Sequence, residues 1–301
     1  MLNRLSIYFK EMFPLGSRLF VGVVMFFEVY FLLLLNSGVQ ADQLSIGIQE
    51  VVGSVTIFIF LMILRIADDF KDYETDQRLF PERALPSGRV HKKDLKTVAV
   101  VVIVLAVAAN LLWMNNIGFF AFLFGYGTLM SVWFFQKSKI QPNLLLALVT
   151  HNPVQLVMNA YIISFTCYKY SLPLVSWTSF LVLLTLYFPA LIWEISRKIR
   201  APKDETEYVT YSRIFGYRKA TRYVLILTVV DVVTNVLLTY RLNRYAVVLI
   251  LLNLVWFGVQ CLRFTKDPTR FRIVDKVERY TYILETLMIV VVVGYLFLGR
   301  L

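Results

Sequence analysis

The chain is poor in cysteine and in charge. Its two cysteines, Cys167 and Cys261, provide no disulfide framework, and neither lies in the spacing of a metal-binding motif. Charged residues make up 17% of the 301 residues, whereas a soluble globular domain carries about 25%. No linker rich in Pro, Gly or Ser interrupts the sequence, so we expect a single domain over residues 1–301.

Apolar residues are abundant instead, and they are grouped in long runs. They make up 58% of the chain, and the mean hydropathy is +0.65. A helix needs about 20 mainly apolar residues to cross the hydrocarbon core of a bilayer. The sequence therefore predicts an all-α, multi-pass integral membrane bundle of about nine transmembrane helices. The expected spans cover residues 18–36, 49–67, 95–114, 118–135, 143–164, 172–193, 223–239, 245–262 and 280–298.

Residues 1–14 form a short amphipathic segment before the first expected span. Leu2, Leu5, Phe9 and Met12 would share one face of a helix, so we expect this helix to lie in the membrane interface. No small-residue cleavage site follows it, and the first span is therefore expected to be an anchor and not a removed signal peptide.

Basic residues outnumber acidic ones, and the net charge is +11. With the N-terminus inside, nearly all of the 31 Lys and Arg fall in alternate loops, which places those loops in the cytoplasm by the positive-inside rule. This bias accounts for the net charge, so we expect no nucleic-acid partner. Two inner loops are long and polar, residues 68–96 and 194–222, and they would cap one cavity if the spans before them are neighbours.

Four aspartates follow the second expected span: Asp68, Asp69, Asp72 and Asp76. On a helix that turns about 100° per residue, the last three lie within about 60° of one another. Carboxylates on one face repel each other unless a cation compensates them. Because Mg²⁺ typically takes one or two carboxylates together with substrate phosphates and water, we predict a site for a metal-bridged diphosphate at the membrane surface.

Basic side chains near the aspartates would take up the remaining phosphate charge. The residues expected in this role are Lys71, Arg78, Arg83 and Arg89. The alternative is a solvated helix end with local salt bridges, such as Glu74 with Arg78 one turn later. The acids continue directly from a membrane span, where unpaired charge is costly, and this position favours a functional role.

The acidic run also carries a family resemblance. DDxxDxxxD at residues 68–76 is followed by RALPSGR at residues 83–89. Together they resemble the UbiA superfamily of intramembrane prenyltransferases, whose first motif is N/DDxxDxxxD with an RPLPSGR-like stretch after it. The number of spans and the second polar loop also match, so the resemblance covers essentially the whole chain. It implies that Asp69, Asp72 and Asp76 bind Mg²⁺, with Asp68 beside them where many members carry Asn.

The second loop departs from the pattern of that family, which shows DxxDxxxD there. Glu194 stands for the first carboxylate, and Asp204 or Glu205 stands for the last across a short insertion. Arg197 and Lys198 replace the middle carboxylate. The resemblance implies catalytic roles for Glu194 and Asp204, with Glu194 as a metal ligand. Arg197 or Lys198 would contact the diphosphate directly, although a basic cytoplasmic loop would also carry such residues.

Two further residues complete the expected substrate contacts. Asn152 shares a helical stripe with Gln155 and Asn159 in the fifth expected span, beside His151. Such a stripe either binds an acceptor or forms hydrogen bonds between helices. Tyr211 would offer an aromatic face to an allylic cation.

Three functions remain open at this stage. The leading hypothesis is a Mg²⁺-dependent prenyltransferase that ionises an allylic prenyl diphosphate and transfers the prenyl group to an acceptor, often aromatic, within the lipid bilayer. A UbiA-type terpene cyclase would share the ionisation step but use no acceptor. A membrane transporter is the third hypothesis, although an odd number of spans without an evident inverted repeat argues against the commonest transporter plans.

Overall fold

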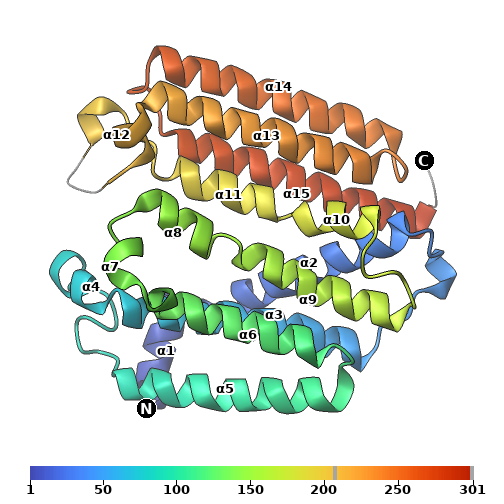
Figure 1. Cartoon of the computed structure of the whole chain (residues 1–301), viewed down its shortest axis with the longest axis horizontal. Helices are drawn as coiled ribbons and strands as arrows, with labels where there is room; N and C mark the ends of the chain where they lie inside the picture. Colours follow the sequence, from blue (N-terminus) through green and yellow to red (C-terminus); the bar gives the residue numbers. More distant parts are fainter. Residues whose placement is uncertain (206–208, 299–301) are drawn as a thin grey trace. The chain divides into compact units, whose positions relative to one another are not determined.

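The computed structural model describes residues 1–205 and 209–298, and this part of the chain is helical and contains no β-strand (Figure 1). Long apolar runs dictate this result, because helices satisfy every backbone polar group internally, as a bilayer requires. The helices are α1 (Leu2–Glu11), α2 (Leu15–Asn36), η1 (Ala41–Gln43), α3 (Ile48–Lys71), α4 (Tyr73–Leu79), α5 (Lys92–Trp113), α6 (Ile117–Ser131), η2 (Trp133–Phe135), α7 (Lys137–Ile140), α8 (Leu144–His151), α9 (Val154–Lys169), α10 (Trp177–Leu184), α11 (Tyr187–Ser196), η3 (Pro202–Asp204), α12 (Tyr211–Phe215), α13 (Tyr217–Thr239), α14 (Arg244–Lys266) and α15 (Ile273–Leu298).

Seven helical segments of the described chain are long and apolar enough to cross a membrane: α2, α3, α5, α10 with α11, α13, α14 and α15. The other two expected spans are helical in a different form. α6 is a shorter apolar helix, and the fifth span is divided into α8 and α9. The prediction of an all-α, multi-pass membrane bundle is confirmed.

Local chemistry explains where two of the spans break. Pro153 lies between α8 and α9, and its ring removes a backbone donor and clashes with the preceding turn. Between α10 and α11, Leu186 adopts the left-handed region with φ of 34°. The carbonyl of Leu183 near this break accepts a hydrogen bond of 2.9 Å from the side-chain amide of Asn159. Asn159 therefore satisfies a backbone group close to the break in the helix.

The chain separates into two compact units. Unit 1 contains residues 1–27, 45–139 and 160–171. Unit 2 contains residues 28–44, 140–159 and the described residues from Leu172 onward. The first acidic motif belongs to unit 1 and the second polar loop to unit 2. The prediction of one domain, and that of one cavity beneath both loops, stay predictions.

In unit 1, α3 packs against both α5 and α6 (Figure 1). Gly127 of α6 permits the close approach, because a Cβ atom at this position would lie 2.7 Å from the ring of Phe60 on α3. Small residues at helix contacts are typical of membrane bundles, in which close backbone packing replaces a hydrophobic driving force.

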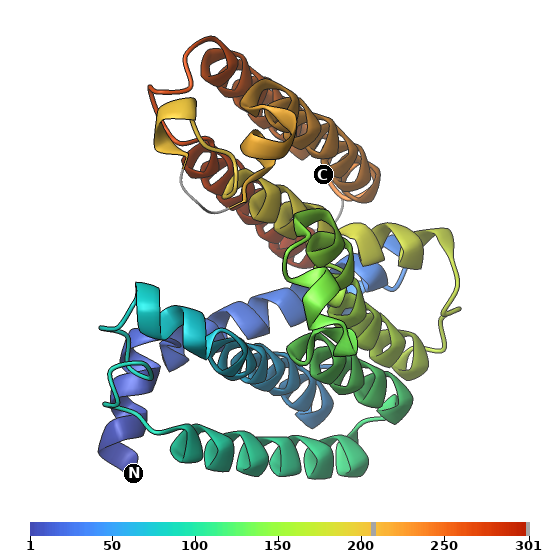
Figure 2. The same cartoon turned by 60° about the vertical axis from the view of Figure 1, so that its left-hand side comes forward.

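In unit 2, α13 packs against α11, α12 and α14, and α14 packs against α15; Figure 2 shows the long helices α13, α14 and α15 running alongside one another. A buried polar cluster joins two of them. The hydroxyl of Tyr280 on α15 donates to Asp231 on α13 at 2.9 Å, and Asn235 donates to the other Asp231 oxygen at 2.9 Å. The intramembrane acid Asp231 is thus hydrogen-bonded through both oxygens.

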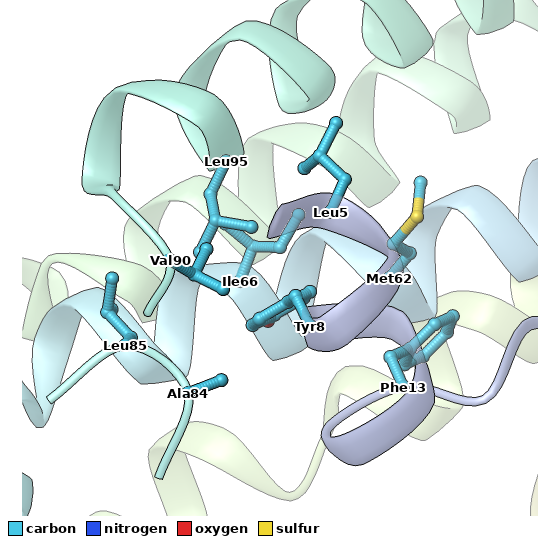
Figure 3. Packing of buried hydrophobic residues seen from close by; sticks show 9 residues of the cluster. All are labelled: Leu5, Tyr8, Phe13, Met62, Ile66, Ala84, Leu85, Val90 and Leu95. Atoms are coloured by element: carbon cyan, nitrogen blue, oxygen red, sulfur yellow. The ribbon is translucent and has the colours of Figure 1, made fainter. Parts of the chain in front are cut away.

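The N-terminal helix α1 packs into a hydrophobic cluster of unit 1. The cluster also takes residues from the end of α3, from the loop before α5 and from the start of α5 (Figure 3). Leu5, Tyr8 and Phe13 are its members from the N-terminal region. Leu2, on the expected apolar face, is 77% exposed, whereas Tyr8 is fully buried. That the helix lies in the membrane interface stays a prediction.

Candidate functional site

The first acidic motif lies where α3 ends. The backbone bends slightly at Asp72, which has φ −99° and ψ 7° and separates α3 from α4. Helical hydrogen bonding continues across it, with Asp72 N donating to Asp68 O at 2.9 Å and Asp76 N donating to Asp72 O at 2.8 Å. The four aspartates therefore lie on three successive helical turns, although the backbone here forms two helices and not the single helix expected.

Asp69 is the most enclosed of the four. Its carboxylate is buried, and each oxygen accepts one hydrogen bond within unit 1. The hydroxyl of Tyr8 donates to Oδ2 at 2.6 Å, and Arg65 donates to Oδ1 at 2.6 Å. Burial raises the pKa of Tyr8 well above its usual value, so its hydroxyl stays protonated as a donor.

Asp68 and Asp76 each pair with a cation that we expected at the diphosphate. Lys71 lies 3.1 Å from Asp68, and its ammonium also faces the ring of Trp133 at 4.5 Å. Arg83 donates to Asp76 at 2.8 Å. These two basic residues therefore lie beside the motif, and their contact with a diphosphate stays a prediction.

Asp72 differs from its three neighbours. No side chain in the described part of the chain donates a hydrogen bond to its carboxylate, which is only half-buried. Burial raises the pKa of the Asp72 carboxyl, against the opposing charge of Lys71. A carboxylate that lacks a donor and is costly to ionise gains most from a nearby cation, so Asp72 is the carboxylate of the motif most available to one.

The donor set fits magnesium in its chemistry. The motif offers carboxylate oxygens alone, which are the ligands that Mg²⁺ prefers. No group of three or more His, Cys, Asp or Glu side chains in the described residues is arranged to hold an ion by itself. Mg²⁺ commonly binds through one or two carboxylates plus phosphate oxygens and water, so a site shared with a diphosphate needs no such cluster.

The remaining basic candidates of the first loop lie elsewhere. Arg89 pairs with Glu11 of α1 and donates to the carbonyl of Glu82 at 2.6 Å. These contacts hold the loop against α1, so Arg89 has a structural role in this conformation. Arg78 is exposed on α4.

In unit 2, Glu194 lies in the last turn of α11 and is compensated by two cations. Arg197 donates to it at 2.5 Å, and Lys198 lies 2.9 Å away. The residues that replace the middle carboxylate of the family pattern therefore contact the first carboxylate. In this conformation the charge of Glu194 is balanced without a metal.

The last carboxylates of the second loop have different surroundings. Asp204 is exposed and lines a pocket of about 460 Å³ together with Arg197 and Arg200. Glu205 accepts hydrogen bonds from the hydroxyls of Thr210 at 2.7 Å and Ser212 at 2.5 Å. Glu205 therefore stabilises the loop, and Asp204 is the freer of the two.

Two predicted substrate contacts have buried polar atoms without partners among the described residues: the hydroxyl of Tyr211 and the side-chain nitrogen of Asn152. An unsatisfied buried donor costs about 1–3 kcal/mol, which a bound ligand can recover. The other residues of the Asn152 stripe are satisfied. Gln155 donates to Asn159 at 3.0 Å, and Asn159 donates to Leu183.

Comparisons with known proteins identify the family of the chain. The family model described as the UbiA prenyltransferase family matches residues 21–272. The chain belongs to the UbiA prenyltransferase family. The resemblance inferred from DDxxDxxxD and RALPSGR is thereby confirmed.

The fold of this UbiA protein also matches a solved structure from work on digeranylgeranylglyceryl phosphate synthase in membranes. The TM-score is 0.66 at 13% identity, and the match covers 98% of this chain and 99% of that one. A search of curated proteins found no match.

Sequence reasoning missed two residues beside the UbiA motif, Tyr8 and Arg65. Arg65 precedes Asp69 by one helical turn, a spacing at which Arg and Asp commonly pair, so it could have been found. Tyr8 lies at helical spacing from Leu5 and Met12, which indicates a shared buried face. That pattern does not indicate that the Tyr8 hydroxyl donates to Asp69.

Proposed function

We propose that this UbiA-family protein is a Mg²⁺-dependent intramembrane prenyltransferase that ionises an allylic prenyl diphosphate at the motif containing Asp68, Asp69, Asp72 and Asp76. The observation that carries the proposal is the Asp72 carboxylate, which receives no side-chain hydrogen bond from the residues that the structure describes. The charges of the neighbouring aspartates are balanced by Lys71, Arg65 and Arg83. Three carboxylates of this motif are already paired with basic side chains, and the carboxylate of Asp72 is available to a cation. Such a motif suits the binding of a cation together with an anionic substrate.

Bound Mg²⁺ would withdraw electron density from the diphosphate leaving group. Breaking the allylic C–O bond leaves the electron pair on the diphosphate and a positive charge on the prenyl chain. Lys71 and Arg83 are close enough to the motif to exchange their aspartate partners for phosphate oxygens. They would then stabilise the charge that develops on the leaving group.

The acceptor would attack the prenyl cation and lose a proton. Asn152 and Tyr211 are our candidates for contacts with the acceptor or with the cation, because each has a buried polar atom without a partner in the described chain. Arg197 and Lys198 would bind the diphosphate only by releasing Glu194. We place the motif loops on the cytoplasmic face because they carry most of the basic residues.

The first experiment uses the purified full-length chain in lipid with Mg²⁺ and geranyl, farnesyl or geranylgeranyl diphosphate. Pyrophosphate release is measured without an acceptor and then with a panel of acceptors. The panel contains aromatic acids and, because the similar solved structure concerns digeranylgeranylglyceryl phosphate synthase, glyceryl phosphate lipids. Release that requires an acceptor and yields a prenylated product supports the proposal.

Two controls make the result decisive. Asp72→Ala should abolish release, whereas Asp42→Ala should leave it unchanged, because Asp42 is an exposed residue of η1 outside the motif. Cyclic hydrocarbons formed without an acceptor would replace the transferase proposal by a terpene cyclase. Full turnover by Asp72→Ala would refute the site.

A further inference from the structure

α1 lies before the part of the chain that the family model matches, which begins at residue 21. It is nevertheless tied to the acidic motif and the loop after it. Within unit 1, Tyr8 donates to Asp69 at 2.6 Å, and Arg4 donates to Asp94 at 2.6 Å. Glu11 pairs with Arg89 of the RALPSGR stretch. The N-terminal helix is thus joined to three segments that follow it.

The ring of Tyr8 is part of a cluster of buried apolar residues. It is fully buried in the cluster shown in Figure 3, with Met62 and Ile66 of α3 and with Leu85 and Val90 of the loop. Side chains in such close-packed surroundings occupy one position. The position of the Tyr8 hydroxyl is therefore fixed by packing and does not depend on its hydrogen bond.

The hydroxyl donates to a carboxylate whose oxygens still have lone pairs available. Tyr8 occupies one lone pair on Oδ2 of Asp69, and Arg65 occupies one on Oδ1. Each carboxylate oxygen has about two lone pairs, so one on each oxygen remains. Two donors from different elements, α1 and α3, fix the plane in which these remaining lone pairs lie.

We propose that Tyr8 is a positioning residue of the metal site, which α1 supplies to the first acidic motif by orienting Asp69 through its hydroxyl. The inference rests on the proposed function, in which Asp69 binds Mg²⁺. Hydrogen-bond partners of metal ligands typically change metal affinity by about 10–100-fold when they are removed. Tyr8 itself contacts neither metal nor substrate.

A purely structural role predicts something different. Tyr8→Phe keeps the ring in the cluster and removes the hydroxyl alone. If the ring matters only for packing, this variant binds metal as the wild type does. If the hydroxyl orients Asp69, metal affinity falls while the fold persists. Tyr161→Phe is the matched control, since Tyr161 is another fully buried tyrosine of unit 1 and its hydroxyl donates to Asn110 at 2.8 Å, away from the motif.

The test measures free Mn²⁺ by electron paramagnetic resonance, with Mn²⁺ as the probe for Mg²⁺ and inorganic pyrophosphate present, on the full-length protein in lipid nanodiscs. Tyr8→Phe should raise the apparent Kd for Mn²⁺ about tenfold. Tyr161→Phe should leave it within about twofold of the wild type. An unchanged or lower Kd in Tyr8→Phe overturns the proposal.

A second readout is the Mg²⁺ concentration that gives half-maximal turnover, which should rise in Tyr8→Phe and not in Tyr161→Phe. Both readouts are half-saturation values, so they do not depend on the fraction of a variant that folds. Asp72→Ala distinguishes failure of the positioning role of Tyr8 from failure of the proposed function. If it weakens Mn²⁺ binding and Tyr8→Phe does not, only the positioning role is refuted. If the wild type binds no Mn²⁺ with pyrophosphate, the proposed function is refuted together with it.

Discussion

The ammonium group of Lys71 lies 3.1 Å from Oδ1 of Asp68 and at the same time faces the ring of Trp133. Its side chain is only 9% exposed, whereas that of Asp68 is 45% exposed. The cation is therefore held in place by its surroundings, and the carboxylate is the more mobile partner. Under the proposed function, a diphosphate at the motif would replace Asp68 at a lysine that is already positioned.

Replacing Lys71 by Met should weaken binding of the prenyl diphosphate. Loss of a charge-assisted contact to phosphate predicts a KM about tenfold higher, while the thioether side chain retains the packing against Trp133. Steady-state kinetics at saturating Mg²⁺ measure the change. Lys139→Met is the control, because Lys139 is an exposed lysine of α7 in the same unit. Equal KM values in the two variants would exclude Lys71 from the diphosphate site.

Glu194→Gln should reduce kcat/KM less than Asp72→Ala does. The charge of Glu194 is balanced by Arg197 and Lys198, whereas the Asp72 carboxylate has no hydrogen-bond donor in the described chain. Kinetics of the two variants under identical Mg²⁺ concentrations give the comparison. A loss as large as that of Asp72→Ala would instead place Glu194 at the metal, as the family pattern predicts.

Asn159→Leu should lower stability, whereas Asn152→Leu should weaken binding of the acceptor. Asn159 bonds to both Gln155 and Leu183, so its removal should lower the free energy of unfolding by about 1–3 kcal/mol. The side-chain nitrogen of Asn152 has no partner in the described chain, so its removal should cost little stability and raise the KM of the acceptor. Thermal unfolding and acceptor titrations measure the two effects. An unstable Asn152→Leu with an unchanged acceptor KM would assign Asn152 to packing.

Gly127→Val should destabilise the contact between α3 and α6. The new side chain would begin 2.7 Å from Phe60, and such overpacking costs about 1–3 kcal/mol. Gly125→Val in the same helix is the control, since a Cβ atom there meets nothing within 4 Å. Thermal unfolding of the two variants in one detergent gives the difference. Equal stability would mean that the Phe60 ring can move aside.

The pair of Glu11 and Arg89 should make a contribution to stability that depends on pH. Arg89 holds the pKa of Glu11 below its usual value of 4.5, so the folded state favours the ionised carboxylate. The contribution is therefore present above pH 4.5 and is lost as the pH falls through the lower pKa of the folded state. Melting curves of the wild type and Glu11→Gln should differ at neutral pH and converge in acid. A constant difference would show that the pair does not titrate.

Much of this arrangement follows from sequence patterns of short range. Hydropathy predicts the spans, and the i, i+3 and i, i+4 spacing of Glu194 with Arg197 and Lys198 already indicates their ion pairs. The aspartates keep their shared face because helical hydrogen bonds continue through Asp72. Each of these features depends on contacts between residues that are one or two helical turns apart. Such contacts can be inferred directly from the spacing of residues in the sequence.

Other features depend on contacts between distant segments. Tyr8 and Asp69 are 61 positions apart, and only the packing of α1 into the cluster brings them together. The break at Leu186 has a local signal, because Pro189 lacks the backbone N–H that would bond to the carbonyl of Thr185 in a continuous helix. The hydrogen bond that Asn159 donates to Leu183 near this break comes from another helix, and no local pattern indicates it. A linear pattern identifies the buried face of α1 but not the carboxylate that its tyrosine reaches.

Three of the four aspartates in the motif already have a positively charged partner from the protein itself: Asp68 with Lys71, Asp69 with Arg65 and Asp76 with Arg83. Under the proposed function, binding of a metal and a diphosphate at this motif would therefore exchange counter-ions more than it would add charge. The free energy of binding would be a difference between two sets of ion pairs, one internal and one with the ligands. The internal ion pairs offset the repulsion among these carboxylates, so they stabilise the folded protein in the membrane before any ligand binds.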